Sequence, residues 1–222
     1  MEAKYHMTQK DNIFVARRNI VDYIWKSAKL EGLTVTYPAT DAIFNGMSAA
    51  KVPVDEIIAV NNLKHAWRFI LEDLDYPPNL NFICEINRIV GGDTLIRGAG
   101  SIRKLPASIG GTTWKPDIPI ESQVKEQLSE TLSIKNPTER AIMLTLYIMR
   151  KHMFIYGNKR TAMLAGNHVM ISSGCGIISV PIDEIENFRE LLIAFYESGN
   201  PRELSLFLYD KCIDGMEFEP ED

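Results

Sequence analysis

Residues 152–162 read His-Met-Phe-Ile-Tyr-Gly-Asn-Lys-Arg-Thr-Ala, and this stretch decides both the fold and the site. A histidine stands a few residues before a Gly-Asn-Lys-Arg turn at which a new helix is predicted to begin. The first turn of a helix offers unpaired backbone N–H groups and the positive end of the helix dipole, so it binds anions. A histidine beside such a turn is a candidate general base next to a phosphorylated substrate.

Helices are predicted on both sides of this stretch. The run Asn136-Pro137-Thr138-Glu139 is a helix start, with Asn as N-cap and Pro at the first position, and that helix runs to about Lys151. After the turn, a buried helix ending at Gly174 is predicted, followed by an amphipathic helix over 183–198 and a last helix around 204–208.

The N-terminal part of the chain also shows helical periodicity. A first helix carries Ile13, Ile20 and Ile24 on one face and ends at Gly32, and a shorter helix follows Pro38. Further helices are predicted over 60–74, which Pro77-Pro78 follows, over 82–90, which Gly91-Gly92 closes, and over 124–132. Residues 91–119 break the pattern with glycines and prolines, which indicates a long loop or a small hairpin.

Composition limits the classes of function. The 222 residues are 45% hydrophobic, enough for one sizeable core, and the net charge of −5 argues against nucleic-acid binding. Three scattered cysteines indicate a reducing compartment. The N-terminus does not read as a signal peptide, and no apolar run approaches the ~20 residues of a membrane span, so a cytoplasmic protein without membrane contact is expected. The acidic end, residues 217–222, is expected to fray.

The residues of the turn each have a predicted task. Gly157 lets the backbone approach a phosphate or adopt positive φ, and Asn158 can cap the helix and donate to a phosphate oxygen. Lys159 and Arg160 add positive charge, although such a pair is often only a solvated helix face. Taken alone, His152 could equally be a histidine on a polar helix end.

The stretch resembles the signature of the Fic/Doc family, His-x-Phe-x-(Asp/Glu)-Gly-Asn-(Gly/Lys)-Arg. The matching residues are His152, Phe154, Gly157, Asn158, Lys159 and Arg160. The resemblance implies an all-α, Fic-type helical bundle with a small β-hairpin flap over the active site. It also implies transfer of AMP from ATP to a hydroxyl of a target protein, with His152 as general base and residues 157–160 as the nucleotide-binding cradle.

Two positions depart from the family pattern. Tyr156 stands where the family has the acid that holds Mg²⁺, and a phenol is a poor ligand for this ion, so Mg²⁺ is left open as a cofactor. Met163 stands where the family has a second arginine. Two alternatives to AMP transfer follow. The lysine in the cradle is similar to the Doc branch, which implies a protein kinase, and the two departures are compatible with a non-catalytic nucleotide-binding scaffold.

A second resemblance lies upstream. Residues 27–32, Ser-Ala-Lys-Leu-Glu-Gly, resemble the Ser-x-x-x-Glu-Gly inhibitory helix that precedes many Fic domains. Ser27 and Glu31 are one helical turn apart, so both can face one site. In the family this glutamate pairs with the second arginine; here it needs another partner, either Arg160 or Ser and Asn groups. Residues 1–36 are therefore predicted to form an N-terminal regulatory segment packed on a catalytic domain over 37–216. The other reading is an ordinary glutamate near a helix end.

The irregular segment supplies the third resemblance. Gly-Ser-Ile-Arg at 100–103 and Ile-Gly-Gly-Thr at 109–112 are similar to the family's flap, which pairs with an extended segment of the target. This implies Ile102, Arg103, Ile109 and Gly110 as target-binding residues; an ordinary surface loop is the alternative. The expected partners are a nucleotide and an unidentified target protein, and self-association is left open.

Overall fold

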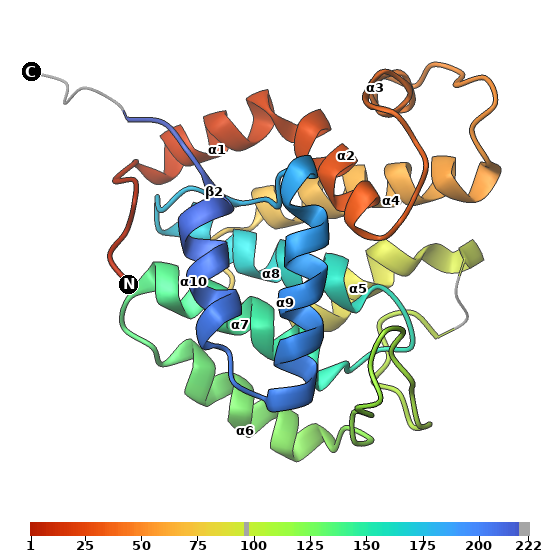
Figure 1. Cartoon of the computed structure of the whole chain (residues 1–222). Coiled ribbons are helices and arrows are strands. Elements are labelled where there is room, and N and C mark those ends of the chain that lie inside the picture. The colour runs from red at the N-terminus through yellow and green to blue at the C-terminus, as the bar shows by residue number, and fades with distance from the viewer. Residues whose placement is uncertain (96–97, 218–222) are drawn as a thin grey trace, which may run out of the picture.

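The fold of the chain was analysed in a computed structural model, which describes residues 1–95 and 98–217 (Figure 1). The α-helices in these ranges are α1 (Gln9–Arg18), α2 (Ile20–Leu30), α3 (Tyr37–Phe44), α4 (Val54–Glu72), α5 (Leu80–Leu95), α6 (Glu121–Leu132), α7 (Pro137–Lys151), α8 (Asn158–Ser172), α9 (Ile185–Ser198) and α10 (Arg202–Lys211). A short 3₁₀ turn, Ile182–Glu184, precedes α9. The expected fraying of residues 218–222 lies outside the described residues.

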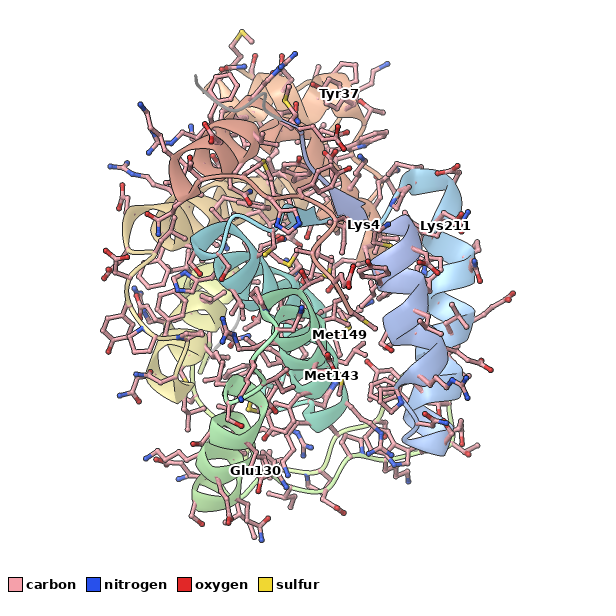
Figure 2. All side chains as sticks on the ribbon, turned by 90° about the vertical axis from the view of Figure 1, so that its left-hand side faces the viewer. Lys4, Tyr37, Glu130, Met143, Met149 and Lys211 are labelled. Atoms are coloured by element: carbon pink, nitrogen blue, oxygen red, sulfur yellow. The ribbon has the colours of Figure 1, made fainter. Side chains whose placement is uncertain are left out.

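Helix α8 is the centre of the bundle, and Figure 1 shows α5, α7, α9 and α10 arranged around it. It is buried on nearly all sides, from Asn158 to Ile171 except for Lys159, because α7, α5, α4 and α1 all pack against it. Most side chains of α8 from Ala162 to Ile171 are small or apolar, which is typical of a helix that a bundle buries on all sides. In Figure 2, Met149 of the neighbouring helix α7 lies inside the bundle, whereas Tyr37 and Lys211 lie at its edge.

The predicted start of α7 is confirmed in detail. Asn136 is the N-cap, and its side chain accepts a hydrogen bond from the backbone N–H of Glu139 at 2.9 Å. Pro137 is the first helical residue, where a missing N–H costs nothing. The helix ends at Lys151, so His152 is delivered at its C-terminus as expected.

The first predicted helix is in fact two helices. The chain breaks at Asn19, which ends α1 and begins α2 with φ of −107° and ψ of 11°. Asparagine favours such a position because its side chain competes with the backbone for hydrogen bonds. Both helices nevertheless pack into one hydrophobic core that they share with the rest of the chain. The members of this core range from Met7 to Ile213.

The all-α class is confirmed, with one small antiparallel sheet. Strand β1 (Ile177–Ile178) pairs with β2 (Ile213–Asp214), and Ile178 lies opposite Ile213. The expectation of a β-hairpin within residues 91–119 is wrong for the described residues, because 98–119 form an irregular loop. Three prolines in that loop lack the N–H group that a strand ladder needs. No helix within the described ranges is long and apolar enough to cross a bilayer.

Candidate active site

His152 lies at the junction between α7 and the loop that leads to α8. Its backbone is in the left-handed region, with φ of 48° and ψ of 53°, which turns the chain sharply at the end of the helix. Its N–H donates to the carbonyl of Ile148 at 3.2 Å, and its own carbonyl accepts a hydrogen bond from Arg103 Nε at 2.7 Å. The backbone of His152 is therefore held at a fixed place beside the loop.

The loop after His152 is fixed by two asparagines. The Asn158 side chain accepts from the Phe154 N–H at 3.0 Å and donates to the Phe154 carbonyl at 2.8 Å, while the Phe154 ring is buried in the core. Asn87 of α5 donates to the carbonyl of Tyr156 at 2.8 Å and to the Thr161 hydroxyl at 3.1 Å. Asn158 thus shapes the loop rather than capping α8, which corrects part of its predicted role.

Gly157 is the turn residue that brings the chain into α8. Its φ is 74°, a left-handed conformation that side chains rarely adopt, and an added Cβ would lie 3.0 Å from Val90 Cγ1. No described side chain caps α8, and the N–H groups of residues 158–160 have no acceptor among the described residues. The turn therefore presents the unpaired donors that an anion-binding site requires.

Most of the predicted site residues line one pocket of about 330 Å³. Its wall is made of residues from the helix ends, the loop over 98–120 and α9: Glu31, Ile109, Gly110, His152, Ile155, Tyr156, Gly157, Asn158, Lys159, Arg189, Leu192, Ile193 and Tyr196. The volume is in the range of small-ligand sites, and a few polar groups converge within a largely apolar wall. The structure thus brings together His152, residues 157–159, Glu31, Ile109 and Gly110 in one wall. Arg160 does not line the pocket and is buried beside Glu31.

Three predicted residues lie elsewhere. Ser27 faces a separate cavity of about 20 Å³ that Met163 also lines, so it does not share the pocket with Glu31. Ile102 packs against the hydrophobic core. Arg103 is 2% exposed, which corrects its prediction as a target-binding residue.

Arg103 instead ties the loop together. Its guanidinium donates to the carbonyls of His152, Leu105, Pro116 and Asp117, at 2.6 to 3.2 Å. Its backbone N–H donates to the carbonyl of Met153 at 2.9 Å. These bonds satisfy carbonyls on both arms of the loop, so a strand ladder is not needed to hold the arms side by side.

We expect Arg103→Met to destabilise the protein by about 2 kcal/mol, because buried carbonyls lose a charged donor. Arg68→Met is the matched control, since Arg68 forms an exposed ion pair with Glu72 and such pairs contribute little. Urea unfolding of both variants measures the difference. Equal unfolding midpoints for the two variants would show that Arg103 does not hold the loop.

The electrostatics of the pocket keep His152 neutral. Burial, supported by the positive charges of Arg103 and Lys159 and opposed by Glu31, lowers the pKa of His152 from 6.5 to about 4. The Nδ1 atom is buried without a hydrogen-bond partner among the described residues. A neutral imidazole near pH 7 is the form that can accept a proton.

We expect the ring signal of His152 in NMR to titrate near pH 4 rather than near 6.5. His152→Asn identifies the signal by its loss. Because the unfolded chain binds this proton more readily between these two pH values, His152 also contributes a loss of stability as pH falls from 6.5 toward 4. A midpoint at or above 6.5 would contradict the geometry.

Glu31 is held between two cations of the cradle. Its Oε2 lies 3.8 Å from Lys159 Nζ, and its Oε1 lies 3.6 Å from Arg160 Nε. Arg160 is therefore the partner that Glu31 needed in the absence of a second arginine. The contact between the end of α2 and the start of α8 places an acidic group at the mouth of an anion site.

The residues at the pocket do not fit a resident Mg²⁺ ion. Tyr156 presents a phenol where the family presents an acid, and its ring lies 4.5 Å from the Arg160 Cζ atom. Glu31 is the only carboxylate among the described residues of the pocket wall, and two cations already neutralise it. Nowhere in the described ranges do three His, Cys, Asp or Glu side chains group as a metal site.

Two residues of the site carried no usable signal in the sequence. Asn87 lies in the middle of α5, where a single polar residue indicates nothing by itself. Tyr196 was predicted only as part of an amphipathic helix, yet it lines the pocket and stacks on Trp114 with ring centroids 5.6 Å apart. Burial, and then the negative charge of Glu31, raise the pKa of Tyr196, so its hydroxyl stays protonated beside the cradle.

Comparisons with known proteins point to one family. The profile of the Fic/DOC family matches residues 77–170. The chain is 29% identical over 186 residues to the protein adenylyltransferase fic-1 of Caenorhabditis briggsae; the match covers 78% of this chain and 36% of that protein. The fic-1 of Caenorhabditis elegans is also 29% identical, over 183 residues. The chain thus spans about a third of the length of the curated relatives it matches.

Solved structures share the fold. Fic-1 of C. elegans superimposes with a TM-score of 0.75 at 25% identity, over 88% of this chain and 62% of that one. A Fic domain containing signaling protein from Bacteroides thetaiotaomicron has a TM-score of 0.75 at 20% identity, over 91% of this chain and 85% of that one. The second likeness concerns the fold alone.

Proposed function

Because the chain belongs to the Fic/DOC family through a domain over residues 77–170, we propose that it transfers AMP from ATP to a hydroxyl of a target protein. The observation that carries the proposal is the neutral His152 imidazole, which lines the same pocket as the anion cradle of α8. The name of the curated relatives, protein adenylyltransferase, supports this reaction over others that use a phosphate cradle.

In the proposed reaction, the hydroxyl oxygen of the target attacks the α-phosphorus of ATP. The bond from that phosphorus to the bridging oxygen breaks, and diphosphate leaves. His152, which is neutral near pH 7 in this environment, accepts the proton of the attacking hydroxyl. The N–H groups of the first turn of α8, with Lys159 and Arg160, stabilise the negative charge on the phosphates.

The loop over 98–120 is proposed to guide the target. Ile109 and Gly110 lie at the pocket, and Gly110 leaves open space where a side chain would stand. The loop is anchored on α9, because the Thr112 hydroxyl and the Thr113 N–H both donate to Glu197. A target segment that lies along this loop would bring its hydroxyl toward His152. The target protein itself is a matter for experiment.

Glu31 is proposed to restrain the activity. It occupies the space between Lys159 and Arg160 that phosphate oxygens need, so the α2 helix must release it before the cradle can be filled. This restraint would come from the N-terminal segment, in keeping with a regulatory role for residues 1–36.

A second candidate is a kinase reaction, favoured by Lys159 in the cradle. It differs from AMP transfer in which phosphorus the hydroxyl attacks. The test incubates the wild type and Glu31→Gly with a cell lysate and with ATP labelled at the α or the γ position. Label from the α position supports AMP transfer, and label from the γ position alone supports the kinase. Nucleotide binding without label from either position would leave a non-catalytic scaffold.

A further inference from the structure

The guanidinium of Arg160 is a buried cation that lacks hydrogen bonds. Arg160 is 1% exposed, and its Nε, Nη1 and Nη2 atoms make no hydrogen bond to any residue that the structure describes. Buried polar groups are normally paired, because leaving them unpaired costs free energy. Donors arranged in this way point to a ligand that is an anion.

Glu31 marks the position that this anion would take. It lies between Arg160 Nε at 3.6 Å and Lys159 Nζ at 3.8 Å, distances too long for hydrogen bonds. Its own Oε1 atom is buried and has no hydrogen-bond partner among the described residues. Glu31 thus neutralises the two cations without satisfying their donors, and it can be exchanged for a better-fitting group such as a phosphate.

Tyr156 keeps the two cations available. Its ring lies against the Arg160 guanidinium, 4.5 Å from centroid to Cζ, and attracts the cation without neutralising its charge. An acidic residue at this position would either pair with Arg160 or bind a divalent ion. With tyrosine at position 156, both positive charges of the cradle remain for the ligand. This position then offers no carboxylate to a metal ion.

Nothing on the next turn of α8 extends the cradle. Met163 is 7% exposed and lines the cavity of about 20 Å³ together with Leu30, Leu164 and Val180. A thioether donates no hydrogen bond and carries no charge, so a third phosphate that reached this side would gain no contact from it. Arg189, the other cation of the pocket wall, is paired with Glu186 at 2.6 Å. Lys159 and Arg160 are thus the cations left for a ligand, and we match them to two phosphates.

We propose that the pocket binds the diphosphate portion of a nucleotide without a divalent ion. Lys159 and Arg160 supply the counter-charges once Glu31 has moved away, and the third phosphate adds no affinity. The inference rests on the proposed function for the presence of a nucleotide in this pocket. The inference goes beyond the proposed function because it assigns a task to Tyr156. The Tyr156 ring holds the Arg160 guanidinium in place, and this guanidinium supplies the positive charge that a metal ion would otherwise supply.

The test is calorimetric titration of the wild type and Glu31→Gly with ADP, ATP and inorganic pyrophosphate, each with Mg²⁺ and with a chelator. We expect ADP and ATP to bind within about threefold of each other in the chelator. Adding Mg²⁺ is expected to leave the affinity unchanged or weaken it, since the ion neutralises the charges that the two cations pair with. Tightening by Mg²⁺ of about tenfold, or a similar preference for ATP over ADP, would overturn the inference.

Two substitutions of Tyr156 provide matched controls in the Glu31→Gly protein. Tyr156→Phe keeps the ring against Arg160, so metal-free binding is expected to persist. Tyr156→Asp removes the ring and adds a hard anionic oxygen, so binding is expected to depend on Mg²⁺ by about tenfold. Equal Mg²⁺ dependence in all three proteins would overturn the role of Tyr156, and so would a loss of binding in Tyr156→Phe.

The outcomes separate this inference from the proposed function. Metal-free binding of the diphosphate, with no transfer of label in the assay above, would leave the inference standing and remove the enzyme. Transfer of AMP together with nucleotide binding that requires Mg²⁺ would keep the enzyme and remove the inference. Absence of binding by all three anions in both proteins would contradict both.

Discussion

Replacing His152 with alanine is expected to lower the rate of AMP transfer by about 10²–10⁴-fold, the usual contribution of a general base. The imidazole lines the pocket beside the cradle, and burial keeps it neutral, with a nitrogen lone pair free to accept a proton. The measurement compares initial rates of α-label transfer in the wild type and the variant, both also carrying Glu31→Gly so that the cradle is open.

The fold is expected to survive this substitution. The His152 Nδ1 atom has no hydrogen-bond partner among the described residues, but the backbone is left-handed, so alanine adds a small strain. His152→Asn is the matched control, since asparagine tolerates this conformation and cannot serve as the base. Both variants should lose activity with melting temperatures close to that of the wild type. Full activity in either folded variant would remove His152 from the reaction.

Glu31→Gly is expected to tighten nucleotide binding by about 1–3 kcal/mol, or roughly 5- to 150-fold. The carboxylate competes with phosphate for Lys159 and Arg160 and repels it, so removing the side chain frees the cradle. Calorimetric titration with ATP measures the gain. Unchanged affinity would mean that Glu31 is an ordinary residue at a helix end.

The same substitution should destabilise the ligand-free protein. Without Glu31, the buried Arg160 loses its nearest counter-charge, and an unpaired buried charge destabilises the fold. The melting temperature of ligand-free Glu31→Gly is therefore expected to fall below that of the wild type, and added ATP should raise it by more than in the wild type. Glu31→Gln, which keeps the size and removes the charge, separates repulsion from steric blocking.

The part of the site that the sequence predicted is local in the chain. Asn136 and Pro137 predicted the start of α7 because caps act within one helical turn. Gly157 predicted the turn because glycine adopts positive φ without strain, and few other residues do. The pairing of Glu31 with Arg160 was also within reach, since the loss of the second arginine left few cations to choose from.

The part that the sequence could not predict depends on contacts between distant segments. Asn87 and Arg103 hold the carbonyls of Tyr156 and His152 across 69 and 49 residues of chain, and nothing near either residue indicates those partners. Ser27 was misplaced for a related reason. A spacing of one helical turn puts two side chains on one face, but the end of α2 separates them into different pockets.

The sheet was missed because two-residue strands leave no alternating pattern to read. The hairpin expected within residues 91–119 is not formed by the described residues. Glycine-rich turns also occur in loops, and a single buried arginine takes the place of a strand ladder there. Tyr196 belongs with these cases, since its periodicity indicated burial and did not distinguish a core side chain from one that faces a pocket.

The measurement that tests the central claim most directly is the intact mass of the Glu31→Gly protein and of its targets after incubation with ATP. The proposed AMP transfer predicts a gain of one adenylyl group, and the gain should vanish when His152→Asn is added, because that substitution removes the neutral imidazole beside the cradle of α8. A gain of one phosphoryl group, or an adenylyl gain that persists without His152, would contradict the account.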